Sequence, residues 1–212
     1  MPFHKKAWIG ACAAGAFALS GLAHADGNRY ERERNYHSEV SVSEAYVLTT
    51  YGRQNGADNA GTPNPVLLDV RSIGEYVAGH PDKALHVPYP RIHPTVDPTL
   101  SNEEKARLLV EGVKAAVPDL DTPLLVLCRT GARSIAAANI LTEAGYTHVR
   151  NIWEGFEGMP KTGVNGNLLD LNNDGVIDER DWDGWKNFAG LPYSTKLRPT
   201  LIYQPLQHLY YE

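Results

Sequence analysis

The chain has 212 residues, of which 42% are hydrophobic and 21% are charged, a composition typical of an ordinary globular protein. Its formal net charge is −5 at pH 7, which gives it no general attraction for nucleic acid or for an anionic membrane. We therefore expect any anion that it binds to be held locally, by a specific group of residues.

The first 25 residues predict a segment that is removed during export. Lysines near the start are followed by an apolar run from Ala7 to Leu22 and by small residues up to Ala25, the pattern of a secretory signal. Because the run is short, we expect cleavage, no stable membrane insertion afterwards and a periplasmic location. Cleavage removes Cys12 and leaves Cys128 without a partner for an internal disulfide. Such a thiol is either buried and inert or kept for its reactivity.

The mature chain alternates apolar runs typical of buried strands with segments of helical periodicity. The clearest helix begins at Ser101, which forms a capping box with Glu104, and ends before Pro118. In chain order, the predicted elements are a loose polar leader (26–39), a short helix with Ser43 as its N-cap and Gly52 at its end, a loop (53–65), a strand (66–70), a short helix (71–80), a strand (84–87), the helix from Ser101, a strand (124–127), a helix (133–144) and a strand (148–152).

Strands that alternate with helices at this spacing predict an α/β fold, in which a parallel sheet is covered by helices on both faces. In such sheets, ligands bind at the carboxyl ends of the strands. Cys128 stands at that end of the strand 124–127, directly before a helix. The sequence therefore places its retained thiol where an active site is expected.

The segment CRTGARS, residues 128–134, has the residues that an anion-binding loop needs. Gly131 allows a tight turn, and successive amides in such a turn can face inward as a concave nest. The positive end of the helix that begins near Arg133 points at the same place. Together these groups would stabilise a thiolate at Cys128 and attract an oxyanion. The alternative is a small buried residue that packs at the end of a strand.

Three longer motifs resemble those of one enzyme family. LLDVRSIGEYVAGH (67–80) has the form of a strand and helix ending in Gly-His, and LCRTGARSIAAANILTEAGYTHVRNIWEGFEG (127–158) that of an active-site loop, its helix and the final strand. GWKNFAGLPY (184–193) is similar to a closing helix. With these motifs, residues 40–192 resemble a single-domain rhodanese, a sulfurtransferase. The family usually has Ile-Pro-Gly-Ala after Gly-His, whereas this chain has PDKA (81–84), so the rim of the site is expected to differ.

The resemblance implies a rhodanese-like parallel sheet and a persulfide mechanism without an organic cofactor. Cys128 would take a sulfane sulfur from a thiosulfate-type donor and pass it to a thiol or a cyanide-like acceptor. Arg133 would bind the sulfonate of the donor and Arg129 would add positive charge, while Asp69 and Arg71 would brace the loop region. The expected substrate-binding residues are Arg129, Thr130, Gly131, Ala132, Arg133 and Ser134, with the amides of residues 130–134 holding the thiolate or persulfide.

Residues 170–181, DLNNDGVIDERD, lie in a predicted insertion (159–183) and have the register of an EF-hand calcium loop. Alternating oxygen ligands let such a loop surround a hard cation, and Gly175 stands where the sharp turn is needed. The last position has aspartate in place of the usual glutamate, as in dockerin repeats, and residues 179–188 are expected to form the exiting helix. The alternative is an acidic surface turn without metal. The expected ligands of a Ca²⁺ ion are Asp170, Asn172, Asp174, the carbonyl of Val176, Asp178 and Asp181.

Two other functions stay open at this point. Cell-cycle phosphatases and arsenate reductases, which have a related fold, place five residues between Cys and Arg, whereas four residues separate Cys128 from Arg133. We expect the shorter ring to be too tight for a tetrahedral phosphate or arsenate, which favours sulfur transfer. The second alternative is a calcium-dependent binding, sulfur-carrier or sensor module that would load sulfur once and need a protein acceptor.

Residues 193–212 form an apolar and aromatic tail without clear periodicity. Such a segment either packs back on the domain or docks on a protein partner. The sequence leaves both possibilities open, and we treat the tail as a region outside the rhodanese-like domain.

Overall fold

The computed structural model describes residues 29–52 and 64–212. The signal-peptide prediction for residues 1–25 and most of the predicted loop 53–65 therefore lie outside the described residues. Within the described part of the chain, no helix has the length and apolar character that crossing a membrane requires.

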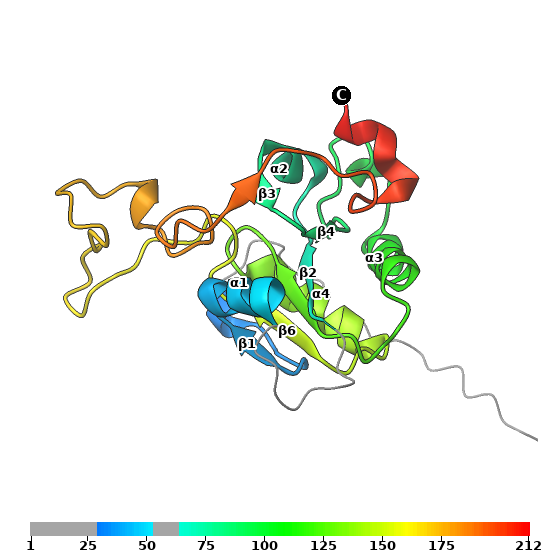
Figure 1. The fold of residues 1–212 in the computed structure, drawn as a ribbon, viewed down its shortest axis with the longest axis horizontal. Helices are drawn as coiled ribbons and strands as arrows, with labels where there is room; N and C mark the ends of the chain where they lie inside the picture. The colour runs from blue at the N-terminus through cyan, green and yellow to red at the C-terminus, as the bar shows by residue number, and fades with distance from the viewer. Residues whose placement is uncertain (1–28, 53–63) are drawn as a thin grey trace, which may run out of the picture.

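A five-stranded sheet with the order β1-β6-β5-β2-β4 forms the centre of the fold (Figure 1). Every neighbouring pair of strands is parallel. β5 (Leu124–Leu127) lies in the middle and is buried at all four residues, as its uninterrupted apolar sequence requires. It pairs with β6 (Val149–Ile152) and β2 (Val66–Asp69), while β1 (Ser38–Val40) and β4 (Leu85–His86) form the two edges.

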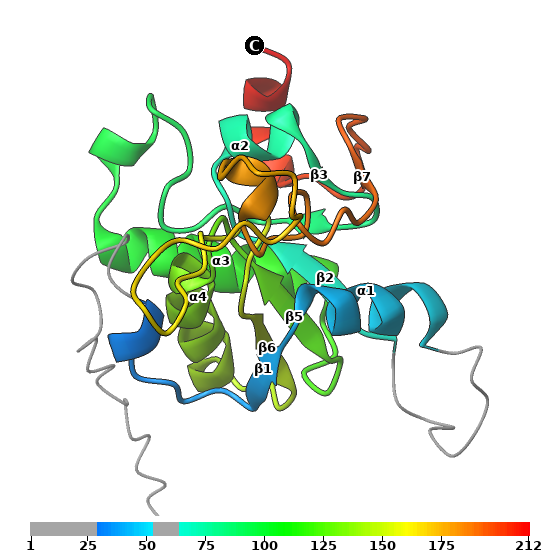
Figure 2. The same cartoon turned by 90° about the vertical axis from the view of Figure 1, so that its left-hand side faces the viewer.

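Four α-helices accompany the sheet in the described residues. They are α1 (Val42–Tyr51), α2 (Ile73–Ala78), α3 (Asn102–Ala116) and α4 (Ala132–Glu143). Figure 2 shows α3 and α4 on one side of the sheet and α1 on the other. The predicted α/β class, a parallel sheet with helices on both faces, is confirmed. The smaller elements are β3 (His80–Pro81) and β7 (Tyr193–Ser194), which pair antiparallel, and the 3₁₀ helices η1 (Arg29–Glu31), η2 (Asp97–Thr99), η3 (Glu179–Asp181) and η4 (Gln204–Tyr210).

Local sequence signals set the starts of the helices. At α3 the predicted capping box is confirmed, because the Ser101 hydroxyl accepts from the Glu104 amide (3.2 Å) and the Glu104 carboxylate accepts from the Ser101 amide (2.7 Å). At α1 the prediction of Ser43 as the N-cap is wrong. Ser41 has the extended backbone of a cap and accepts from the amide of Glu44 at 3.1 Å, so the helix begins two positions earlier than an N-cap at Ser43 predicts.

The predicted loose leader is wrong for its described part. Arg29 is buried, and β1 (Ser38–Val40) adds an edge strand parallel to β6. The amide of His37 already donates to the carbonyl of Val149 at 2.9 Å, so the pairing begins inside the leader. A three-residue strand with the sequence SEV has no apolar run, and edge strands depend on pairing rather than on burial. That is why the sequence pattern did not reveal it.

The predicted exiting helix over residues 179–188 is also wrong. Only η3 (Glu179–Asp181) is helical there, and turns follow it. The amides of Trp185 and Lys186 donate to the carbonyls of residues 155–156 (3.0 and 2.8 Å) and so are not available for helical bonds. The closing helix implied by the rhodanese resemblance is replaced by the same turns. The insertion, drawn in yellow to orange, extends away from the sheet (Figure 1).

The tail packs back on the domain, the first of the two alternatives. The amide of His86 donates to the carbonyl of Leu201 at 2.7 Å, so the tail continues alongside the edge strand β4. Four of its aromatic and aliphatic side chains are buried, which is favourable because burial removes their apolar surface from water. The buried residues of the tail are Ile202, Tyr203, Leu209 and Tyr210.

Candidate active site

Cys128 lies directly after β5, at the carboxyl end of the central strand, and is fully buried. The loop that follows turns at Gly131, whose φ of 86° lies in the left-handed region that favours glycine. A Cβ atom added there would lie 2.1 Å from the carbonyl oxygen of Trp153, so no other residue fits this turn. Gly131 is also the N-cap of α4, whose positive end therefore begins at this loop.

Three consecutive carbonyls of the loop accept hydrogen bonds from outside it. The carbonyls of Cys128 and Arg129 accept from the amides of residues 156–158, at 2.8 Å for the first and at 2.9 and 3.1 Å for the second. The carbonyl of Thr130 accepts from the guanidinium of Arg29 at 3.1 Å. These bonds fix the direction of each peptide plane in the loop.

The amides of the same peptides point the other way. In a planar trans peptide, the N–H is antiparallel to the preceding carbonyl, so the amides of Arg129, Thr130 and Gly131 point away from these outside donors. In the described part of the chain, none of these three amides donates a hydrogen bond to another protein group. Successive unpaired amides next to a helix N-terminus are what an anion nest requires.

The hydroxyl of Ser134 contacts the sulfur. Its oxygen lies 3.3 Å from Sγ of Cys128 and 3.0 Å from the carbonyl oxygen of Gly131. A hydroxyl carries one hydrogen, so it either donates to the Gly131 carbonyl and accepts from a thiol, or donates to a thiolate. Sequence reasoning assigned Ser134 only through its amide, and the structure adds its side chain.

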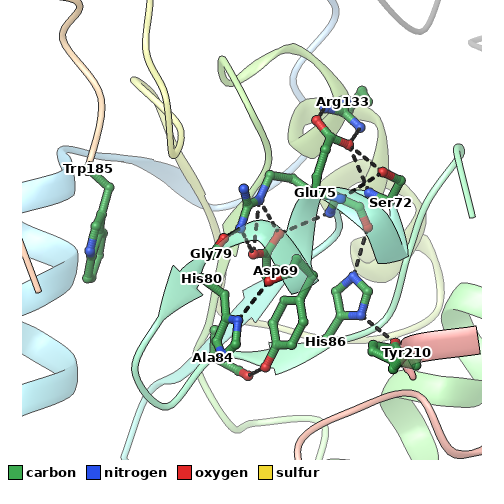
Figure 3. A network of polar contacts seen from close by, with 12 residues as sticks. Asp69, Ser72, Glu75, Gly79, His80, Ala84, His86, Arg133, Trp185 and Tyr210 are labelled. Carbon is green, nitrogen blue, oxygen red and sulfur yellow. Dashed lines mark hydrogen bonds and ion pairs between the residues drawn. The ribbon is translucent and has the colours of Figure 1, made fainter. Parts of the chain in front are cut away.

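Arg133 forms a bidentate ion pair with Glu75 of α2 (Figure 3). Its two terminal nitrogens lie 2.8 and 2.6 Å from the Glu75 oxygens. Burial raises the pKa of Glu75, but the hydrogen bonds and charge of Arg133 outweigh it and lower that pKa to about 2. The pair fastens α2 to the start of α4. A donor sulfonate would have to share the guanidinium with Glu75, so the expected sulfonate contact of Arg133 stays a prediction.

Asp69 and Arg71 form a second buried ion pair beside the first. Arg71 donates to both oxygens of Asp69 (3.0 and 2.7 Å) and to the carbonyl of Gly79 (2.7 Å). Its guanidinium lies 3.9 Å from the ring centroid of Phe156, close enough for a cation–π interaction. The amide of Phe156 donates to the carbonyl of Cys128, so Phe156 connects the Asp69–Arg71 pair to the loop.

His86 connects the tail to this network (Figure 3). Its Nε2 lies 2.8 Å from the carbonyl of Arg71, and its Nδ1 contacts the hydroxyl of Tyr210. A neutral ring with the proton on Nε2 satisfies both contacts, since the Tyr210 hydroxyl can then donate to Nδ1. Burial lowers the pKa of His86 to about 4, so the neutral form is the one that the fold stabilises.

The other arginine of the loop faces solvent. The side chain of Arg129 is 51% exposed, and its Nε lies 3.5 Å from a carboxylate oxygen of Glu157. An ion pair of this length and exposure is weak, which leaves Arg129 available to an incoming anion. Of the remaining predicted loop residues, Thr130 is partly exposed, and Gly131, Ala132 and Ser134 are buried.

Sequence reasoning missed two charged residues that contact the loop, Arg29 and Glu75. Glu75 stands three residues after Ser72 and forms a capping box with it, a pattern that marks the start of α2 but says nothing of Arg133. Arg29 lies in a run of charged residues with no local signal at all. Its contact with Thr130 spans 101 positions, a separation that a pattern of neighbouring residues cannot show.

The predicted calcium loop is organised by contacts within itself. Both carboxylate oxygens of Asp170 accept from backbone amides (3.2 and 2.7 Å), and so do both oxygens of Asp181 (2.8 and 3.1 Å for one, 2.9 Å for the other). Arg180 supplies a positive charge, at 2.7 Å from Asp174 and 2.8 Å from Asp178. In residues 29–52 and 64–212, no three acidic, histidine or cysteine side chains are placed together to hold a metal.

The two remaining predicted ligands, Asn172 and Val176, are exposed. The side-chain oxygen of Asn172 accepts from the amide of Asp174 at 2.9 Å. The geometry of the loop thus gives no support to a bound calcium ion, which stays a prediction from the register of the sequence.

Comparison with known proteins shows the family of this chain. A family model described as a rhodanese-like domain matches residues 54–161. The chain belongs to the rhodanese-like domain family. Thiosulfate sulfurtransferase 18 of Arabidopsis thaliana is 33% identical over 117 residues, which cover 55% of this chain and 74% of that protein. Thiosulfate sulfurtransferase GlpE of Actinobacillus pleuropneumoniae is 30% identical over 127 residues, 60% of this chain and 90% of that protein.

Among solved structures, the crystal structure of Rv0390 from M. tuberculosis is similar, with a TM-score of 0.45 and 24% identity over 76% of this chain and 99% of that chain. The match to the rhodanese-like family contains Cys128, the whole loop and Glu75. The loop 170–181 and the tail lie outside it, so they are features of this chain beyond the matched rhodanese-like range.

Proposed function

We propose that this protein is a sulfurtransferase that moves a sulfane sulfur from a thiosulfate-type donor, through a persulfide on Cys128, to a thiophilic acceptor. The observation that carries the proposal is the arrangement of the loop after Cys128, in which three carbonyls are held outward and the three following amides have no protein acceptor among residues 29–52 and 64–212. Membership of the rhodanese-like family and two relatives named as thiosulfate sulfurtransferases support the same class of reaction.

In the loading step, the thiolate of Cys128 attacks the outer sulfur of thiosulfate. A new S–S bond forms on Cys128, the S–S bond of thiosulfate breaks, and sulfite leaves with the electron pair of that bond. The enzyme then carries a persulfide with one negative charge. In this proposal, the amides of residues 129–131 and the hydroxyl of Ser134 stabilise this charge, because donors fixed in advance need no rearrangement when the charge develops.

In the second step, the acceptor attacks the outer sulfur of the persulfide. Cyanide becomes thiocyanate, or a thiolate becomes a persulfide, and the bond electrons return to Cys128 as a thiolate. No proton or electron is gained or lost by the protein over the cycle. The same loop therefore stabilises the thiolate before loading and after transfer.

The two loop arginines have different parts in this proposal. Arg129 is exposed and loosely paired, so it attracts the anionic donor. Arg133 is 4% exposed, and its charge is neutralised by Glu75, so it holds the loop on α2. It contacts the donor sulfonate only where the sulfonate competes with the Glu75 carboxylate for the guanidinium.

Turnover tests the proposal directly. Thiosulfate and cyanide should give thiocyanate repeatedly with the native protein and none with Cys128→Ser. A carrier or sensor would load sulfur once and stop without a protein acceptor. Hydrolysis of an aryl phosphate without thiocyanate formation would instead assign the loop to the phosphatase and arsenate reductase branch.

We also propose export to the periplasm, with cleavage after Ala25. The proposal rests on the sequence of residues 1–25. The mass of the protein recovered from the periplasm of a bacterial host should correspond to a chain that begins at Asp26. Recovery of the uncleaved chain from the cytoplasm would remove the proposal.

A calcium ion in residues 170–181 is a separate proposal, which rests on the register of Asp170, Asp174 and Asp181 with Gly175 at the turn. For an ion to bind, Arg180 has to release the carboxylates that it contacts. We therefore expect binding no tighter than that of extracellular calcium modules, about 10⁻⁴–10⁻³ M.

A further inference from the structure

Arg29 is a buried arginine from the N-terminal segment that lies against the sulfur loop. Its side chain is 2% exposed. One terminal nitrogen donates to the carbonyls of Thr130 (3.1 Å) and Trp153 (3.0 Å), and the guanidinium lies 4.7 Å from the ring centroid of Trp153. Burying a guanidinium costs free energy unless it is paired and hydrogen-bonded, so these contacts specify where it sits.

Asp183 holds the other terminal nitrogen of Arg29, at 3.2 Å. This carboxylate is itself buried and fixed, because one of its oxygens accepts from the amide of Met159 (2.7 Å) and the other pairs with Lys161 (2.6 Å). Asp183 stands at one end of the insertion 159–183, and Met159 and Lys161 stand at the other. Arg29 therefore joins the N-terminal segment, the sulfur loop and the base of the insertion.

The contact with Thr130 controls the third peptide of the loop. Backbone amides hold the first two loop carbonyls, whereas the Thr130 carbonyl is held by the Arg29 side chain. Because the peptide is planar, fixing this carbonyl also fixes the direction of the Gly131 amide. Glycine populates both signs of φ readily, so the peptide before Gly131 has little intrinsic preference to stay in this orientation.

We propose that Arg29 is a positioning residue for sulfur transfer, which holds the Thr130 carbonyl outward so that the Gly131 amide stays directed into the anion nest. The inference rests on the proposed function, since the nest is assigned there to the thiolate and persulfide of Cys128. The base of the insertion takes part through Asp183, which orients Arg29. Removing the guanidinium frees the peptide to turn, and the nest loses one of its three amides.

Two substitutions of Arg29 and one control test this. Arg29→Met keeps an apolar stem and removes every donor, and Arg29→Lys keeps the charge with a single donor group. Arg107→Met is the control, because it also breaks an arginine ion pair but on the surface of α3, where the side chain is 59% exposed. For each purified protein, we would measure kcat and KM for thiosulfate, the rate constant of sulfur loading on Cys128, and the pH profile of alkylation of the Cys128 peptide by iodoacetamide.

We expect Arg29→Met to lower kcat and the loading rate constant roughly 10- to 100-fold, the cost of a small misplacement of reacting groups, with KM changed much less. The alkylation profile of Arg29→Met should move to higher pH. Arg29→Lys should recover part of the lost rate and part of the shift in the alkylation profile. Arg107→Met should match the native protein in both measurements. Unchanged kcat and an unchanged alkylation profile in folded Arg29→Met would show a merely structural role and overturn the proposal. If Arg29→Met does not fold, native values in Arg29→Lys overturn it in the same way.

Failure of the proposed function gives a different result. If the native protein takes no sulfur from thiosulfate, sulfur transfer is removed, but the alkylation profile still reports on the loop. A shift of that profile in Arg29→Met would then support the positioning of the loop by Arg29, and no shift would overturn it.

Discussion

The ion pair between Arg133 and Glu75 gives the sharpest prediction about the stability of the site. Glu75→Gln removes the negative charge and keeps the size of the side chain. Ser72 is the N-cap of α2, and the glutamine oxygen can still accept a hydrogen bond from its amide. The change therefore isolates the charge of the pair more cleanly than a truncation would.

The size of the effect follows from the pKa of Glu75, which falls from an ordinary 4.5 to about 2 in the fold. A shift of 2.5 units corresponds to about 3.4 kcal/mol. Because the side chain is 24% exposed and glutamine keeps part of the hydrogen bonding, we expect a loss of about 2 kcal/mol, a fall of roughly 4–8 °C in Tm. A carboxylate whose pKa is lowered by folding stabilises fully above 4.5, and this stability is lost as the pH falls through about 2.

Urea unfolding followed by circular dichroism, at about pH 7 and at lower pH down to about 3, measures both the size and the pH window. The native protein should be more stable than Glu75→Gln at pH 7, and the difference should shrink below pH 4.5. Glu111→Gln is the matched control, because it breaks an exposed ion pair with Arg107, and it should change the urea midpoint little. The reasoning fails if Glu75→Gln costs no more than the control, or if its cost does not depend on pH.

Three further predictions concern the tail, the donor and the metal. The native protein should lose about 3 kcal/mol of stability as the pH falls from 6.5 to about 4, because His86 takes up a proton in the unfolded chain but not when it is buried. His86→Gln should lack this loss. An equally steep loss in the variant, measured by urea unfolding, would contradict the prediction. Arg129→Met should raise the KM for thiosulfate roughly fivefold with Tm unchanged, and an unaltered KM in steady-state kinetics would exclude the contact. Calcium at about ten to a hundred times its Kd should stabilise the native protein by roughly 1.4–2.7 kcal/mol over a chelator, and less in Asp174→Asn, whereas equal melting curves with calcium and chelator would remove the ion.

The sequence predicted those parts of the fold that local rules specify. β5 has the bounds that its four apolar residues indicate, and α3 begins at the Ser101 capping box, since burial and capping act within a few residues. The turn at Gly131 was predictable for the same reason, because a left-handed residue before a helix favours glycine.

The rest of the site depends on contacts between distant segments. Glu75 reaches Arg133 across 58 positions, and Arg29 reaches Asp183 across 154. No periodicity or capping pattern shows such pairs, so the sequence left Arg133 open to a sulfonate where the fold supplies a carboxylate. The exiting helix was mispredicted for the same reason, since the amides of Trp185 and Lys186 bond to another segment.

Intact-mass analysis after brief exposure to thiosulfate tests the central claim most directly. The native protein should gain the mass of one sulfur atom, located on the Cys128 peptide and removed by cyanide, and Cys128→Ser should gain nothing. An unchanged native mass, or sulfur that also adds to Cys128→Ser, would contradict the assignment of Cys128 as the carrier of the transferred sulfur.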